Sequence, residues 1–296
     1  MTTAVMRFAF ASAVVAAALA PGSARADEPF PTKPVRMIVS FAAGGPTDIV
    51  AKSPADGYTL LMATVSTHAI NPGLYRKIPY DPIVDFEPLG QVGVTPTLLS
   101  VHPSLPVNDV KGLIKLIKDN PAKYTYGSSG VGSILHLCGE QFKNAAGGLN
   151  VLHVPYRGSA PMTNDLIGGQ ISMAFDATPT ALPQALAHKT RALAAGMAKR
   201  LRQLPDLPTM QEQGVKDYEC YTWNAIMAPG GTPKPVIAAL NKAINQSLAD
   251  PAVFKHLQEV GIEPTPGSTP EKTAEFVKTE LAKWAAIIKA SGAQID

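Results

Sequence analysis

The 296-residue sequence has few charged side chains, few cysteines and few aromatic residues. Charged residues make up 17% of the chain and aromatic residues 6%, and the formal net charge at pH 7 is only +3. No cluster of basic residues occurs, alone or interleaved with aromatics. This composition excludes nucleic acid or an anionic membrane surface as the main partner. Beyond the first 26 residues, no apolar run is long enough to cross a bilayer.

Metal and thiol chemistry have little support in the sequence. The six histidines are never at ligand spacing from one another, so we expect no metal site. The two cysteines are Cys138 and Cys220. They could form a disulfide, although one pair across so long a chain is no framework. We favour two buried thiols, because Cys138 falls among apolar residues of a predicted helix.

The N-terminal segment has the pattern of a secretory signal peptide. Residues 1–26 contain no acidic residue, an early Arg7 and an apolar stretch over Phe8–Ala20, followed by the small-x-small pattern Ala24-Arg25-Ala26. The alternative is an apolar tail without defined structure. We expect a mature chain that begins near Asp27 in the periplasm. Its 24 basic and 23 acidic residues, left once Arg7 and Arg25 are removed, nearly balance.

After Asp27, short apolar runs alternate with longer helical patterns, which predicts an α/β fold. The predicted strands are Val35–Phe41, Thr59–Thr64, Leu89–Val94, Leu98–His102, Tyr124–Gly127, Val151–Pro155, Ser172–Asp176, Arg191–Ala195 and Tyr218–Ala228. The predicted helices are Asp109–Asp119, Gly132–Ala146, Ala160–Ile167, Pro179–Ala187, Pro233–Leu248, Pro251–Val260 and Pro270–Ala290. In the last helix, Thr269 suits the N-cap, and an apolar stripe over Phe276–Ile288 predicts a side that faces the core.

The connection after the first strand is the most informative segment. The run Val35–Phe41 predicts a short buried strand, and the next residues form Phe41-Ala42-Ala43-Gly44-Gly45-Pro46-Thr47-Asp48. The glycines predict a turn, and Pro46 to Asp48 suit the first turn of a helix. Such a junction presents backbone N–H groups and the positive end of a helix dipole. We therefore predict an anion site here, with an ordinary strand–helix connection as the alternative.

Two later connections have the same character. Residues 127–133 (GSSGVGS) lie between a predicted strand and a helix, and residues 154–159 (VPYRGS) follow the next strand. These turns offer N–H groups and hydroxyls to an anion, and Arg157 can pair bidentately with a carboxylate. The alternative for Arg157 is an ordinary surface side chain. Because ligands of α/β sheets bind at the carboxyl ends of strands, we expect the loops to share one site.

Four further segments occur in order along the chain together with these loops: Pro54–Leu60 (PADGYTL), His68–Pro72 (HAINP), Pro205–Thr209 (PDLPT) and Ala228–Pro233 (APGGTP). The ordered set resembles the Bug receptors, the TctC-like solute-binding components of tripartite tricarboxylate transport systems. The resemblance spans residues 30–296. It implies a non-enzymatic receptor with a type II periplasmic-binding-protein fold, in which two α/β domains are hinged around a cleft.

The resemblance also implies domains, partners and site residues. Residues 27–102 and 223–296 would form domain one, and residues 103–222 domain two. The ligand would be a small carboxylate bound without a cofactor or metal ion, and the partners would be the membrane permease subunits. We expect a monomer that binds no nucleic acid. The residues carried over to the cleft are Phe41, Ala42, Ala43, Gly44, Gly45, Thr47, Asp48, Thr64, Ser66, Thr67, Ser128, Ser129, Gly130, Gly132, Ser133, Tyr156, Arg157, Gly158 and Asp176.

The first connection departs from the family. Relatives place a full helix, a strand and a glycine-rich loop between Asp48 and Pro54, whereas here Ile49–Ser53 leads straight into Pro54. Only the seventeen residues of Ala42–Tyr58 join the first two strands, which leaves room for about two turns of helix. We predict a shortened first domain with an exposed sheet edge, lower stability and weakened ligand closure.

The predicted function is that of an extracytoplasmic receptor that closes on a carboxylate and delivers it to a transporter. The alternatives are a receptor that presents its liganded surface to a sensor, and a truncated homologue with impaired binding. An enzyme is disfavoured, because the first loop lacks G-x-G-x-x-G spacing and no G-x-S-x-G motif occurs. The identity of the carboxylate stays open.

Overall fold

The computed structural model describes residues 30–39, 46–291 and 294. The predicted signal peptide and the loop residues Phe41–Gly45 lie outside these ranges. Strands and helices alternate along the described chain, as the sequence predicts. The strands are β1 (Arg36–Val39), β2 (Thr59–Thr64), β3 (Phe86–Val101), β4 (Thr125–Ser128), β5 (Leu152–Pro155), β6 (Met173–Ala177), β7 (Arg191–Ala195), β8 (Tyr221–Pro229) and β9 (Glu263–Pro264).

The helices that the sequence predicts are all present, with boundaries within two residues of those expected. The complete set is α1 (Pro46–Ala51), the π-helical turn η1 (Ser66–Ile70), α2 (Asn71–Leu74), α3 (Val110–Asp119), α4 (Ile134–Ala145), α5 (Ser159–Ile167), α6 (Thr178–Leu186), α7 (Lys234–Ala249), α8 (Pro251–Glu259) and α9 (Pro270–Ser291). Within the described ranges, no helix combines the length and apolar character needed to cross a membrane.

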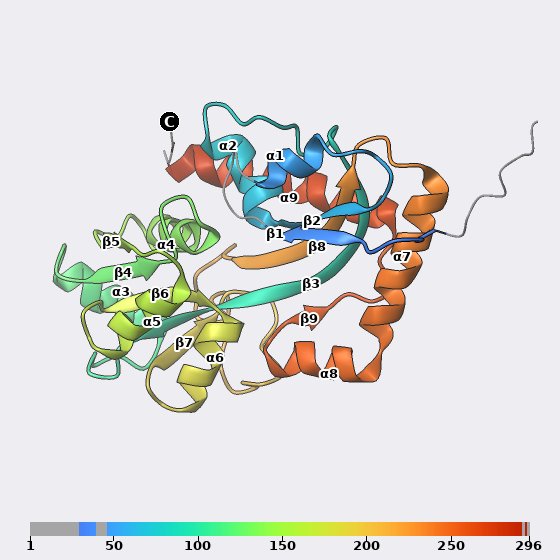
Figure 1. Ribbon diagram of the computed structural model, residues 1–296. Coiled ribbons are helices and arrows are strands. Elements are labelled where there is room, and N and C mark those ends of the chain that lie inside the picture. Colours follow the sequence, from blue (N-terminus) through green and yellow to red (C-terminus); the bar gives the residue numbers. More distant parts are fainter. Residues whose placement is uncertain (1–29, 40–45, 292–293, 295–296) are drawn as a thin grey trace, which may run out of the picture.

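The described strands join one mixed sheet in the order β1-β2-β8-β3-β6-β4-β5, and β7 and β9 also pair with β3. The long strand β3 is shared between two parts: its residues 86–96 pair with β8, and residues 97–101 pair with β6. We call β1, β2, β8, β9 and residues 86–96 the first half of the sheet, and β4 to β7 with residues 97–101 the second half. Figure 1 shows β3 running from one half into the other.

The prediction of two separate strands, Leu89–Val94 and Leu98–His102, is wrong, because β3 is continuous through both. The gap between them contains Pro96, which has no N–H group to donate to a sheet. In the structure Pro96 is opposite Tyr221, at the last position paired with β8, and Thr97 already pairs with β6. The strand therefore changes partners where its own hydrogen bonding is interrupted.

The strand β1 lies at the edge of the first half, and the prediction that it is buried is wrong. Among the described strands it pairs with β2 alone, in parallel. Met37 is 42% exposed and Val39 is 57% exposed. The connection that follows contains α1, whose six residues confirm the prediction of about two helical turns. An exposed apolar edge strand is thus a feature of this chain.

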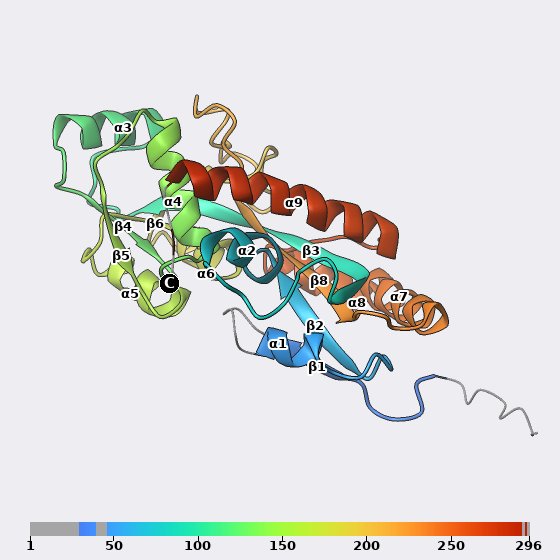
Figure 2. The same ribbon diagram turned by 90° about the horizontal axis from the view of Figure 1, so that it is seen from above.

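Helix α9 packs on β3, the strand shared by the two halves of the sheet, and on neighbouring helices. It contacts η1, α2, β3 and α4, and Figure 2 shows it lying along β3. Its predicted apolar stripe is confirmed in large part, since Val277, Trp284 and Ile288 are buried. The predicted cap is confirmed as well, because the Thr269 hydroxyl accepts a hydrogen bond from the Lys272 amide at 3.2 Å. This helix therefore holds the two halves against one hydrophobic core.

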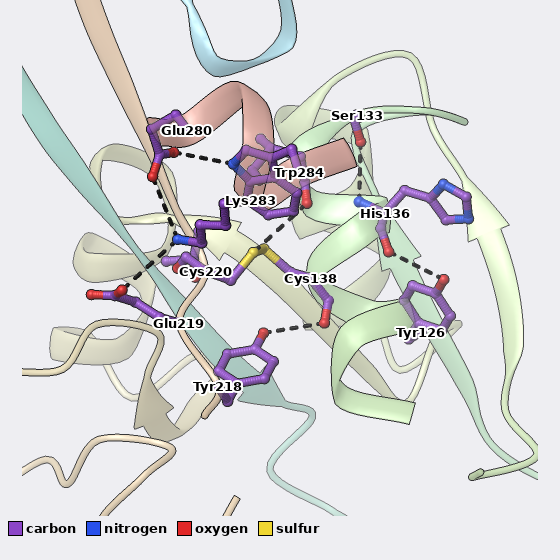
Figure 3. Close-up of a disulfide and its surroundings, with 12 residues drawn as sticks. Tyr126, Ser133, His136, Cys138, Tyr218, Glu219, Cys220, Glu280, Lys283 and Trp284 are labelled. Atoms are coloured by element: carbon purple, nitrogen blue, oxygen red, sulfur yellow. Dashed lines mark hydrogen bonds and ion pairs between the residues drawn. A yellow bond between two sulfur atoms is a disulfide. The ribbon is translucent and has the colours of Figure 1, made fainter. Parts of the chain in front are cut away.

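The two cysteines form a disulfide, so the interpretation as two free thiols is wrong, although both residues are fully buried. The bond joins α4 to the residue before β8, across a sequence separation of 82 residues. Figure 3 shows Tyr218 beside it, and the Tyr218 hydroxyl donates to the Cys138 carbonyl at 3.2 Å. Packing of α4 against this segment brings the two Cα atoms to 5.6 Å, which no local pattern indicates.

Two short regions of regular structure are missing from the sequence prediction. The turn η1 and helix α2 follow β2 directly and bury His68 completely, with its ring edge-on to Phe86 at a centroid distance of 4.8 Å. The strand β9 has two residues and pairs with β3 at Gly93 and Val94. Elements this short carry too little periodicity to be detected from sequence.

Candidate functional site

A cavity of about 530 Å³ lies between the two halves of the sheet. The first half contributes the end of β2, η1 and α2, and the second half contributes the connections after β4, β5 and β6. The described residues that line it are Thr64, Ser66, Asn71, Tyr75, Ser129, Gly130, Val131, Gly132, Ser133, Ile134, Leu135, Gly158, Ser159, Ala177 and Thr222. None of these residues has a charged side chain. A ligand therefore meets hydroxyls, amides and apolar groups.

The connection from β4 to α4 forms a large part of the cavity wall. Ser133 is the N-cap of α4, and its hydroxyl accepts a hydrogen bond from the His136 amide at 3.2 Å. Gly132 has a φ of 75°, a conformation that residues with a Cβ rarely adopt. The turn brings the first helical residues, Ile134 and Leu135, onto the lining. Amides in the first turn of a helix have no backbone partner within the helix, which leaves those of Ile134 and Leu135 to bind a ligand, since Ser133 caps that of His136.

Two more helices begin at the same cavity. Helix α5 begins after Gly158 and α6 after Ala177, and neither N-terminus has a side-chain cap. Both of these N-cap residues line the cavity. Each helix start carries about half a positive charge from the aligned peptide dipoles. A helix start stabilises a nearby anion by about 0.3–1 kcal/mol, and by up to about 2 kcal/mol where the site is partly buried. Three of them around an uncharged wall favour an anionic ligand.

Asp176 lies behind this wall. Its side chain is 3% exposed, and its oxygens accept hydrogen bonds from the hydroxyls of Ser159 at 2.6 Å, Thr163 at 3.1 Å and Thr180 at 2.6 Å. Burial raises the pKa of the Asp176 carboxyl above its usual value, against the opposing effect of these hydrogen bonds. The geometry gives Asp176 a supporting position, in which it orients the cavity residue Ser159.

Residues 36–293 match the model of a protein family described as "Tripartite tricarboxylate transporter family receptor". The chain belongs to this family. It is also similar to a protein of Pseudomonas sp. (strain P51), described as a UPF0065 protein in the tcbD-tcbE intergenic region. The two are 31% identical over 310 residues, which cover 93% of this chain and 91% of the relative.

Solved structures of similar receptors have the same fold. The structure described as R. palustris Rpa4515 with adipate is 35% identical, covers 90% of this chain and 100% of that chain, and has a TM-score of 0.82. The periplasmic binding protein BugD is 33% identical, covers 90% of this chain and 99% of its own, and has a TM-score of 0.80. These likenesses confirm the mixed α/β periplasmic-binding-protein fold and the non-enzymatic receptor class.

The structure brings seven of the predicted site residues of this receptor to the cavity. These are Thr64, Ser66, Ser129, Gly130, Gly132, Ser133 and Gly158. Five more, Phe41 to Gly45, lie outside the described residues. The other predicted residues are not among the described lining residues: Thr47, Asp48, Thr67, Ser128, Tyr156, Arg157 and Asp176.

Several of these remaining side chains have partners within the receptor. The Thr67 hydroxyl donates to the Thr64 carbonyl at 3.2 Å, next to the cavity. The Tyr156 hydroxyl donates to Asp165 at 2.7 Å. Asp48 forms an ion pair with Lys52 at 2.8 Å. The Tyr156 contact joins the loop after β5 to α5, whereas the Asp48 ion pair is local to α1.

Sequence reasoning missed part of the lining. Asn71 is 3% exposed, and its Nδ2 has no hydrogen-bond partner among the described residues, so it can donate to a ligand. Asn71 belongs to the HAINP segment, which is the signal that could have identified it. Ser159 is the last residue of the third predicted loop. Tyr75, at the end of α2, and Thr222, on β8, have no local signal, because these elements reach the cavity only through tertiary packing.

Within the described ranges, no three His, Cys, Asp or Glu side chains gather in a way that could hold a metal ion.

Proposed function

We propose that this receptor captures a small carboxylate in the cavity and delivers it to the membrane subunits of a tripartite transporter. The observation that carries the proposal is an uncharged cavity at which α4, α5 and α6 all begin. Such a wall holds an anion through backbone dipoles and N–H groups, without a counter-charge. The adipate in the structure of the R. palustris relative supports a carboxylate as the ligand class.

The lining indicates how a carboxylate is held from both sides. The second half of the sheet offers the hydroxyl of Ser129 beside the helix starts, and the first half offers Ser66 and the amide Nδ2 of Asn71. A buried donor without a partner costs about 1–3 kcal/mol. A carboxylate that accepts a hydrogen bond from Asn71 and also faces the start of α4 removes that cost and links the two halves.

We infer that the two halves move as domains that close on the ligand. Domain one comprises residues 27–102 and 223–296, and domain two residues 103–222. The change of β3 partners between Pro96 and Thr97 supports a hinge there, since β3 and β8 run alongside each other up to that point. Hinge closure around a ligand is a common motion of periplasmic binding proteins. Residues 1–26 act as the signal peptide that exports the receptor.

We also propose that domain one is shortened relative to the family. The alignment with the Pseudomonas relative extends over 310 residues but covers 93% of this chain, or about 275 of its 296 residues, so about 35 positions are filled by the relative alone. The exposed edge strand β1 and the six-residue helix α1 support a location between β1 and β2. A receptor with impaired binding is the alternative function that this feature favours.

Ligand titration of the mature chain, residues 27–296, tests the proposed function. Adipate should bind saturably in calorimetry and raise the melting temperature, since about 100 Kd of ligand adds about 2.7 kcal/mol to stability. The neutral isostere adipamide should bind far more weakly, because it has no charge for the helix starts to stabilise. If a panel of mono-, di- and tricarboxylates, amino acids and aromatic acids gave no saturable binding, the receptor would be the impaired form.

A substitution that places a negative charge on the cavity wall tests the location of the ligand site more directly. Val131 lines the cavity and is 59% exposed, so Val131→Glu should not disturb the core. The new carboxylate should weaken adipate binding by about tenfold or more, which corresponds to about 1.4 kcal/mol of repulsion. Val84→Glu is the matched control, since Val84 is 73% exposed and is not among the described lining residues. Equal affinities in the two variants would place the ligand elsewhere.

A further inference from the structure

Two imidazoles lie directly behind the loop of residues 128–133. The rings of His136, on α4, and His153, on β5, stack with centroids 4.1 Å apart and an interplanar angle of 19°. The His153 ring also stacks on Tyr126 at 4.8 Å. Neither histidine is among the described lining residues of the cavity. Figure 3 shows the His136 side chain on α4, pointing away from the disulfide.

Both imidazoles are hydrogen-bonded to the loop. The Gly132 amide donates to Nδ1 of His136 at 3.2 Å. Nε2 of His153 lies 2.7 Å from the Ser128 hydroxyl oxygen, which also accepts a hydrogen bond from the Gly130 amide at 3.2 Å. One ring nitrogen of each histidine therefore holds the loop, which is part of the cavity wall, and Nδ1 of His136 does so as an acceptor that can take up a proton.

The contact of His136 with Gly132 requires a neutral ring. Because Nδ1 accepts the Gly132 N–H, it carries no proton, and protonation would set two N–H groups against each other. A proton on each ring would also place two positive charges about 4 Å apart, which is strongly unfavourable in a partly buried site. The Gly132 contact therefore requires a neutral His136, and the close stacking disfavours a proton on both rings together.

The surrounding charges do not reverse this preference. Glu140 on α4 lies 4.0 Å from Nε2 of His136, but it already forms an ion pair with Lys143 at 2.8 Å and accepts the Tyr126 hydroxyl at 2.6 Å. Burial lowers the pKa of His136, and burial together with the neighbouring His136 lowers the pKa of His153 to about 4. At neutral pH both rings are uncharged, and the loop has its hydrogen bonds.

We propose that His136 is a positioning residue of the ligand site, which holds the Gly132 amide and thereby the cavity loop only while its imidazole is neutral. This inference rests on the proposed function of the cavity. Protonation of the His136 ring removes the acceptor for the Gly132 amide, so the ordered loop binds protons less readily than the disordered one. The loop is therefore ordered at neutral pH and loses its order as the pH falls through the apparent pKa of the two histidines. One pH unit below that value, about a tenth of the molecules keep the ordered loop, and the apparent Kd is about tenfold higher.

Two substitutions of His136 separate the hydrogen bond from the titration. His136→Asn places an amide oxygen near the position of Nδ1, so it keeps an acceptor for Gly132 but cannot be protonated in this range. His136→Leu removes the acceptor at every pH. We expect the asparagine variant to bind adipate like the wild type at pH 7.5, and more tightly than the wild type at pH 4. The leucine variant should bind weakly at both. Adipate itself also titrates in this range, but it does so equally for both proteins. The ratio of the variant's affinity to that of the wild type at each pH is therefore free of this effect.

A readout without ligand keeps this test apart from the test of the proposed function. Hydrogen exchange of the Gly132 amide, followed by NMR in the ligand-free protein, should show protection in the wild type at pH 7.5 that falls at pH 4 relative to the asparagine variant. A wild-type-to-asparagine ratio that is constant with pH, in exchange or in binding, would overturn the inference. So would a wild type that gains affinity relative to the variant as the pH falls. If exchange followed the expectation while no carboxylate bound, the role of His136 would stand and the proposed function would fail.

Discussion

Glu280 shows how one buried carboxylate organises its surroundings at the residue scale. It is 3% exposed, and one oxygen accepts the Tyr221 hydroxyl at 2.9 Å. The other oxygen accepts the indole N–H groups of Trp223 at 3.0 Å and Trp284 at 3.1 Å. These contacts connect α9 to β8, and Figure 3 shows Glu280 with Lys283 beside it. The helical stripe predicts Trp284 in the core, but nothing local indicates that Tyr221 and Trp223 of β8 share its polar partner Glu280.

The substitution Glu280→Gln should destabilise the receptor by about 2–4 kcal/mol. The amide group supplies one acceptor where three donors converge, and its own N–H groups then face a donor, which costs about 1–3 kcal/mol for each unsatisfied group. Urea unfolding followed by tryptophan fluorescence measures the change. Glu275→Gln, at an exposed position of the same helix, is the control and should stay within about 0.5 kcal/mol. Equal effects of the two substitutions would contradict this account.

At the scale of elements, helices are better predicted than strands. Helix α9 has a cap at Thr269 and a stripe of apolar side chains, and both depend on neighbours within a few residues. The strand β3 depends on partners more than a hundred residues away, such as Tyr221 opposite Pro96. A local pattern therefore shows an interruption at Pro96, whereas the sheet continues through it with new partners.

The disulfide is the other connection between elements that sequence reasoning did not favour. It closes a loop of 82 residues between α4 and β8. A loop of this length corresponds to about 4.5 kcal/mol in the chain-entropy treatment, within a typical range of about 2–5 kcal/mol. The double variant Cys138→Ala, Cys220→Ala should lose that amount in urea unfolding. Dithiothreitol should destabilise the wild type and leave the variant unchanged. A variant as stable as the wild type would contradict the proposed contribution.

At the scale of the whole molecule, the short connection between β1 and β2 is the feature by which we propose that this receptor differs from its relatives. Met37 and Val39 on β1 and Ile49 on α1 are 42%, 57% and 57% exposed. Full burial of an apolar side chain of this size contributes about 1.5–3 kcal/mol. A segment that covered this edge would therefore add several kcal/mol to the stability of the receptor, and an uncovered edge is one that other strands can pair with.

The mature chain should consequently melt several degrees below the R. palustris receptor in the same buffer. For a protein of this size, each kcal/mol of stability corresponds to about 2–4 °C in melting temperature. Differential scanning calorimetry of both ligand-free proteins, with circular dichroism to establish cooperative unfolding, provides the comparison. An equal or higher melting temperature for this chain would show that the short connection costs no stability.

The candidate site was predictable to the extent that it is made of loops. The segments 127–133 and 154–159 were recognised because glycines and hydroxyl residues between a strand and a helix have a local meaning. The structure places parts of both at the cavity, together with Thr64 and Ser66. Asn71 and Thr222 were missed, because their place in the cavity depends on how α2 and β8 pack against the rest of the chain.

The sequence alone determined the alternation of strands and helices, the helix starts and the uncharged character of the cavity loops. These follow from interactions within about one turn of helix or one connection, which the order of residues contains directly. Tertiary structure decided the pairing of Cys138 with Cys220, the continuity of β3, and the burial of His68, which lowers its pKa to about 3. It also decided which loop residues face the cavity and which lie behind it. Each of these depends on contacts between segments far apart in the chain, and the order of strands in the sheet determines which segments meet.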